Sequence, residues 1–78
     1  MTIEEFRVVV ARLAEELRAA ATLSDDLRRR FIAVRAELFQ RGVFDPILAR
    51  FDTVTVTRAS TQEVAKELAA IAASVSTL

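Results

Sequence analysis

This sequence of 78 residues contains no cysteine and no histidine. Without cysteine, the chain cannot form a disulfide bond or a thiolate metal site. Without histidine, it lacks the commonest general base and a frequent ligand of transition metals. We therefore expect a protein that is not an enzyme and that binds no metal and no cofactor, and we assign no catalytic residue.

Long apolar runs are also missing. The longest stretch without a charged residue is the 11 residues from Leu68 to Leu78, whereas a membrane-spanning helix needs roughly 18–20 apolar residues. The first residues include Glu4 and Glu5, in the place where a secretory signal carries basic residues. The sequence therefore predicts a cytoplasmic protein without a membrane span.

A net charge of either sign is absent too, because 11 basic residues balance 11 acidic ones. The charges are unevenly distributed: residues 1–26 carry six acids and three bases, and residues 27–58 carry three acids and seven bases. This asymmetry favours pairing between helices of one chain or of two copies over binding to a phosphate backbone. Ten of the basic residues are arginine, a residue that tolerates partly buried ion pairs well.

Apolar residues, in contrast, are abundant for so short a chain. They make up 53% of the sequence, and besides alanine they include five Phe, eight Leu, nine Val and four Ile. A single domain of this size removes only about 60–65% of its unfolded surface from water when it folds. We expect residues 1–78 to form one domain that buries the remaining apolar surface by self-association.

Capping residues and apolar periodicity predict four helices in an all-α bundle. Their expected limits are Ile3 to Ala21 after a Thr2/Glu5 capping box, Asp25 to Gly42 after a Ser24 cap, Pro46 to Phe51 after an Asp45 cap, and Ser60 to Val75 with a Ser60/Glu63 capping box. Because the first connection is only two or three residues long, the first two helices should form an antiparallel hairpin.

One segment breaks the helical pattern. Residues 53–57 alternate threonine and valine with period two, as an extended strand does. A single strand cannot satisfy its own backbone hydrogen bonds. The segment is therefore either an extended connector across the bundle or a strand that pairs with its twin across a two-fold axis, with Val54 and Val56 at the interface.

Two of the predicted helices have a second apolar face. In the second helix, Ile32, Ala36 and Phe39 lie over 100° from the centre of the inner stripe. In the last helix, alanines form a separate small-residue face. The candidate interface residues are Ile32, Ala36, Phe39, Val54, Val56, Ala65, Ala69 and Ala72. The Ile32 stripe could be covered within one subunit by the last helix or by the segment around Phe44 and Phe51, or it could be covered by another subunit.

Arginines of the second helix are the candidate nucleic-acid contacts, namely Arg28, Arg29, Arg30 and Arg35. Successive helical residues point about 100° apart, so the triplet does not form one patch. Asp25 and Asp26 also lie at the spacing that pairs with arginines one turn later. Given zero net charge, we regard nucleic-acid binding as the disfavoured alternative.

These patterns favour a small helical module that self-associates and binds another protein, as an adaptor or as a small subunit of a larger complex. A small dimeric DNA-binding regulator or antitoxin, with the arginine-rich second helix on DNA, is the alternative. A carrier of an apolar ligand ranks last, because nothing polar in the apolar stripes offers a contact for a head group.

Overall fold

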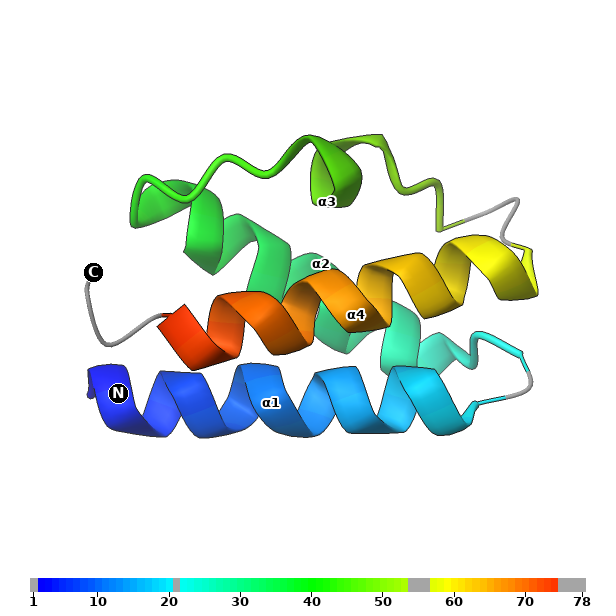
Figure 1. Ribbon diagram of the computed structural model, residues 1–78, viewed down its shortest axis with the longest axis horizontal. Coiled ribbons are helices and arrows are strands. Elements are labelled where there is room, and N and C mark those ends of the chain that lie inside the picture. The colour runs from blue at the N-terminus through cyan, green and yellow to red at the C-terminus, as the bar shows by residue number, and fades with distance from the viewer. Residues whose placement is uncertain (1, 21, 54–56, 75–78) are drawn as a thin grey trace.

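The computed structural model describes residues 2–20, 22–53 and 57–74, which form four helices and no strand (Figure 1). The helices are α1 (Ile3–Ala19), α2 (Asp25–Gln40), α3 (Pro46–Arg50) and α4 (Arg58–Ser74). The all-helical fold and the order of the four helices agree with the prediction. The predicted extended segment includes Val54 and Val56, which lie outside the described residues, so its two alternatives stay predictions.

Helices α1 and α2 each begin after the predicted capping residue, but α1 ends at Ala19 rather than at Ala21, so five residues (20–24) connect the helices instead of two or three. The backbone N–H of Glu5 donates to the Thr2 hydroxyl at 3.1 Å, and the N–H of Leu27 donates to the Ser24 hydroxyl at 3.2 Å. Each hydroxyl thus satisfies an N–H group that has no partner within its helix. Because the connection between the two helices is short, they run in opposite directions (Figure 1).

Gly42 ends α2 as predicted. Its φ of +86° lies in the left-handed region that glycine adopts without strain. The N–H of Gly42 donates to the carbonyl of Phe39 at 3.1 Å, and the N–H of Val43 donates to the carbonyl of Leu38 at 2.9 Å. This pair of bonds is a Schellman motif, and Val43 packs against the core beside it.

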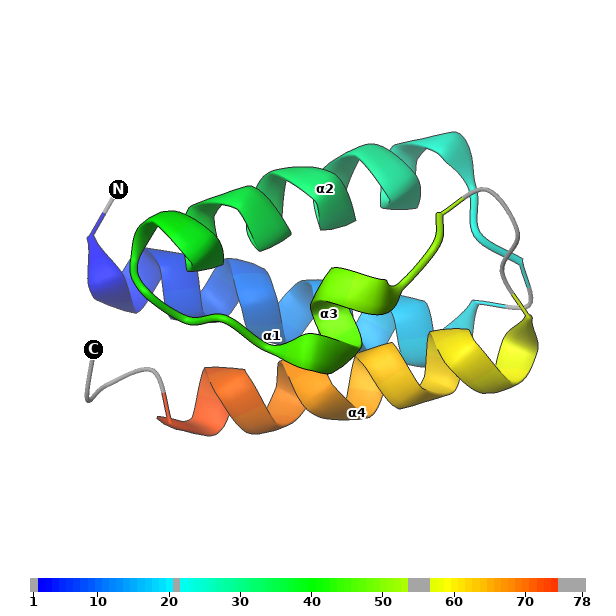
Figure 2. The same cartoon turned by 90° about the horizontal axis from the view of Figure 1, so that it is seen from above.

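The short helix α3 follows the predicted Asp45-Pro46 start. One carboxylate oxygen of Asp45 accepts from the N–H groups of Ile47 and Leu48, and proline occupies the first helical position, where no N–H donor is needed. In two views 90° apart, α3 lies between α2 and α4 on the side of the bundle opposite α1 (Figures 1 and 2). Leu48 is fully buried, so α3 closes that side of the core.

The start of α4 differs from the prediction, because the helix begins at Arg58 rather than at Ser60. The Thr57 hydroxyl accepts from the N–H of Ser60 at 3.1 Å, and the Ser60 hydroxyl accepts from the N–H of Thr57 at 3.1 Å. This is the reciprocal pattern of a capping box, with serine in the position usually held by Glu or Gln. The predicted Ser60/Glu63 box was therefore wrong by one helical turn.

The helices enclose one hydrophobic core. It is formed by Phe6, Val10, Leu13, Ala14, Leu17, Leu23, Phe31, Val34, Leu38, Leu48, Phe51, Val64, Ala65, Leu68, Ile71 and Ala72. These residues recur at steps of three and four along α1, α2 and α4, so each long helix turns one stripe inward.

The closest packing in the bundle is between α1 and α4, not between the two hairpin helices. Ala14 of α1 and Ala65 of α4 line the same seam between the two helices, and both are buried. Alanine side chains let two backbones approach closely, whereas α2 turns Phe31 and Leu38 inward. The small-residue face of α4 is therefore covered in part by α1 of the same chain.

Candidate interaction surface

The second apolar face predicted for α2 lies at the surface. Ile32 is 42% exposed, Ala36 is exposed and Phe39 is half-buried. The ring of Phe44, which follows α2, lies 5.6 Å from the ring of Phe39 and is itself 74% exposed. We call these four residues the α2 face. Phe44 covers part of Phe39, as one alternative suggested, but Ile32 and Phe44 remain open to solvent.

A shallow groove between α1 and α2 runs beside this face. It is lined by Phe6, Val9, Ala33, Val34 and Glu37. Val9 is 37% exposed, so its methyl groups extend the apolar surface from α2 onto α1. Val9 is not among the interface residues predicted from the sequence. The signal was the run Val8-Val9-Val10, because three successive helical residues cannot all point inward.

The remaining candidate interface residues lie elsewhere. Ala65 and Ala72 are only 2% and 6% exposed and belong to the core of this chain. Their small side chains are used in packing within the subunit, so they form no part of an exposed surface. Ala69 is exposed and lines a groove between α1 and α4. Val54 and Val56 lie outside the described residues.

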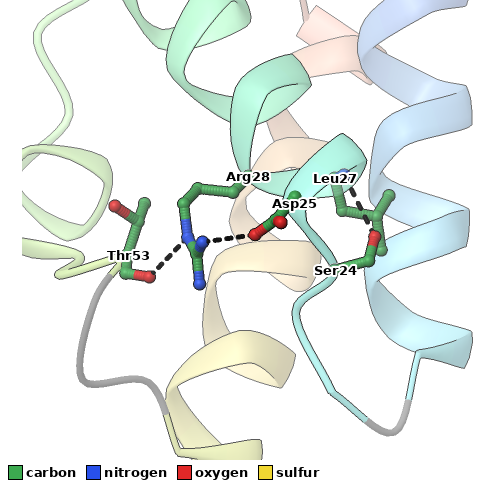
Figure 3. A network of polar contacts seen from close by, with 5 residues as sticks. All are labelled: Ser24, Asp25, Leu27, Arg28 and Thr53. Atoms are coloured by element: carbon green, nitrogen blue, oxygen red, sulfur yellow. Dashed lines mark hydrogen bonds and ion pairs between the residues drawn. The ribbon is translucent and has the colours of Figure 1, made fainter.

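Arg28, a candidate nucleic-acid contact, is held within the chain. Its Nε donates to the carbonyl oxygen of Thr53 at 2.9 Å, and Nη1 lies 2.8 Å from a carboxylate oxygen of Asp25 (Figure 3). Asp25 lies in the first turn of α2, next to the Ser24 cap. Arg28 therefore ties the segment that follows α3 to the start of α2.

Arg35 acts in the same way two turns further along α2. Its Nη1 donates to the carbonyl oxygens of Leu48 and Phe51, at 3.1 and 3.3 Å. These carbonyls belong to the end of α3, where the Leu48 carbonyl also accepts from the N–H of Phe51 at 3.4 Å. The guanidinium group also lies 5.1 Å from the centre of the Phe31 ring, within the range of a cation–π contact.

Arg30 points the other way, toward α1. It donates a hydrogen bond to Glu16 and lies 3.5 Å from Asp26. The hydrogen bond from Arg30 holds the pKa of Glu16 below its usual value, and the same bond raises the pKa of Arg30. Within the part of the chain that the structure describes, Arg29 is exposed and forms no ion pair. A phosphate backbone would thus compete with internal partners at three of the four candidate arginines.

Acidic side chains meet where α3 docks on α4. The pKa of Glu67 is raised, chiefly because its protonated form can donate a hydrogen bond to Asp45, and also because of burial and the nearby charge of Glu63. Lys66 opposes this shift. Since Asp45 also caps α3, the like charges of Asp45 and Glu67 oppose the docking of that helix at neutral pH.

Replacement of this carboxylate should change the pH dependence of stability. A raised pKa means that folded Glu67 binds its proton more tightly than unfolded Glu67, so stability falls as pH rises through the folded pKa. Glu67→Gln should therefore be more stable than the wild type at neutral pH, by about 0.5 kcal/mol, and equal to it at pH 3. Urea unfolding from pH 3 to 7 measures the difference. The prediction would be wrong if the free energy of unfolding changed equally in the wild type and in Glu67→Gln between pH 3 and 7.

Among the residues that the structure describes, no three potential metal ligands lie together, and no helix is long and apolar enough to cross a membrane. No protein-family model, no curated protein and no solved structure matches this chain. The α2 face is an apolar surface on a helix that buries Phe31, Val34 and Leu38 on its inner side.

Proposed function

We propose that this chain is a non-catalytic helical interaction module. It self-associates through the α2 face and works as an adaptor or as a small subunit of a larger complex. The observation that carries this proposal is the exposure of Ile32 and Phe44, at 42% and 74%, around the half-buried Phe39. Contiguous exposed apolar side chains of this kind are typical of protein-protein contact sites.

The energy of the contact would come from removing these side chains from water. Burial of apolar surface stabilises a complex by roughly 25 cal/mol for each Å². Phenylalanine contributes a large apolar area at a small cost in side-chain entropy, and aromatic side chains are enriched in interfaces. Val9 in the adjoining groove adds to the surface that a second chain could cover.

The surrounding charges favour a protein partner over nucleic acid. Arg28 and Arg35 bind backbone carbonyls of their own chain, and Arg30 pairs with Glu16. A surface that binds DNA needs several cations free to contact phosphates. The α2 face instead combines aliphatic and aromatic side chains, which suit the apolar face of another helix.

Light scattering after size exclusion, over a concentration series, tests the proposal. The wild type should form an oligomer, and Ile32→Asp should weaken the association by at least about tenfold, because it would place a charge in an apolar contact. Val8→Asp is the matched control, since Val8 is 52% exposed on α1 and does not belong to the α2 face. Circular dichroism of each variant reports whether it is folded.

Two results would refute the proposal. One is a wild type that stays monomeric and folded at high micromolar concentration. The other is an oligomer that Val8→Asp weakens as much as Ile32→Asp does, because the contact would then not depend on the α2 face.

A further inference from the structure

The outer side of α2 has the spacing of a coiled-coil seam. Arg29, Ile32, Ala36 and Phe39 follow one another at steps of three, four and three residues. Steps of this kind place all four within an arc of about 80° on a helix. The inner stripe, with Phe31, lies on the opposite side in the core. A second helix could therefore pack lengthwise along this seam.

Arg29 on this seam forms no cation–π contact in the described residues, and neither does the ring pair of Phe39 with Phe44. In the described chain, Arg35 lies over the ring of Phe31 and Arg41 lies over the ring of Phe6, 4.9 Å from its centre. No arginine lies in this way over Phe39 or Phe44 within residues 2–20, 22–53 and 57–74. Arg29, on the same side of α2, has no ion pair in those residues either. Both halves of a cation–π contact are therefore present, namely the guanidinium group of Arg29 and the ring of Phe39.

A single α2 cannot bring these groups together. Arg29 and Phe39 are ten residues apart on one helix, or about 15 Å. Two copies of α2 in antiparallel orientation can do so. If the two-fold axis passes the level of residue 34, Arg29 and Phe39 each lie five residues from it, on opposite sides. Arg29 of one copy then lies level with Phe39 of the other.

The same two-fold axis also places Ile32 of one copy level with Ala36 of the other. Ile32 and Ala36 each lie two residues from the level of residue 34. A large side chain then faces a small one in each of the two central layers, which lets the helices approach closely. A two-fold axis makes every contact occur twice, as an isologous dimer requires.

We infer that two copies of this chain pair α2 against α2 in antiparallel orientation, with Arg29 of each copy over the Phe39 and Phe44 rings of the other. This inference rests on the proposed self-association and specifies its geometry. Charge selects the orientation, since a parallel pair in register would set the two Arg29 guanidinium groups against each other. In the antiparallel pair, each cation meets the negative face of a ring near the C-terminal, negative end of the partner helix.

Dissociation constants from sedimentation test the contact. Because the contact occurs twice in a dimer, Arg29→Ala should weaken association by about tenfold. Phe39→Leu should also weaken it, and the double variant should lose clearly less than the product of the two single losses. Arg12→Ala is the control, because Arg12 is an exposed arginine of α1 outside the seam. A constant for Arg29→Ala equal to that of Arg12→Ala would overturn the inference.

A distance measurement tests the orientation. Because the natural chain has no cysteine, Gln40→Cys provides one attachment point per subunit for a spin label. Position 40 is exposed and lies six residues from the level of the axis. The two labels should be about 20 Å apart in the antiparallel pair and about 10 Å apart in a parallel one. The shorter distance in a dimer would refute this geometry and leave the proposed self-association in place, whereas a monomeric wild type would remove both.

Discussion

Phe31→Ala is expected to lower the free energy of unfolding by about 3–5 kcal/mol, the usual loss when a buried phenylalanine is truncated. Phe31 is fully buried, and its ring meets the ring of Phe51 edge to face, with centres 5.0 Å apart. The ring also supports the guanidinium group of Arg35, which binds the end of α3. Its removal leaves a cavity and weakens the docking of α3 as well.

This loss is large for so small a domain, whose total stability we place at about 4–12 kcal/mol from typical values per residue. Urea unfolding followed by circular dichroism, at concentrations below self-association, measures the change. Phe44→Ala makes the same chemical change at a position 74% exposed and should cost less than about 1 kcal/mol. Similar losses for the two variants would show that Phe31 is not part of the core.

The parts of the fold that the sequence predicts well are set by local chemistry. Thr2, Ser24 and Asp45 each cap the helix that they were expected to cap, and Gly42 ends α2. Each of these roles depends on a hydrogen bond within a few residues or on a backbone angle of a single residue. Helix caps and helix ends depend on residues that are close together in the sequence, so they can be predicted from one sequence alone.

The start of α4 shows how competition between local signals can mislead. Ser60 and Glu63 have the spacing of a capping box, but Thr57 and Ser60 have the same spacing one turn earlier. The structure uses the earlier pair, which adds residues 58 and 59 to the helix. Glutamate is preferred three residues after the capping residue, and this preference favoured the incorrect Ser60/Glu63 pair.

The candidate surface required information that the sequence pattern does not hold. Periodicity shows that α2 and α4 each have a second apolar face, but it does not show which neighbour covers which face. The structure packs Ala65 of α4 against α1 and leaves Ile32 of α2 exposed. Arg28 and Arg35 also donate to backbone carbonyls of residues 48–53, and no pairing rule based on charge predicts these contacts.

The close packing of α1 on α4 leads to the last prediction, which concerns Ala65→Leu. Ala65 is 2% exposed and lines the seam that it shares with Ala14. Three further carbon atoms would force the two helices apart or push the new side chain out of its preferred conformation, and overpacking of this kind costs about 1–3 kcal/mol. We expect a loss of unfolding free energy in that range, measured by urea unfolding.

Ala70→Leu separates packing from helix propensity. Ala70 lies on the exposed side of the same helix, and leucine is nearly as good a helix former as alanine. The control should therefore change the free energy of unfolding by no more than about 0.5 kcal/mol. If Ala65→Leu were as stable as Ala70→Leu, the α1–α4 seam would have room for a branched side chain. Alanine at position 65 would then not be what lets these two helices pack most closely.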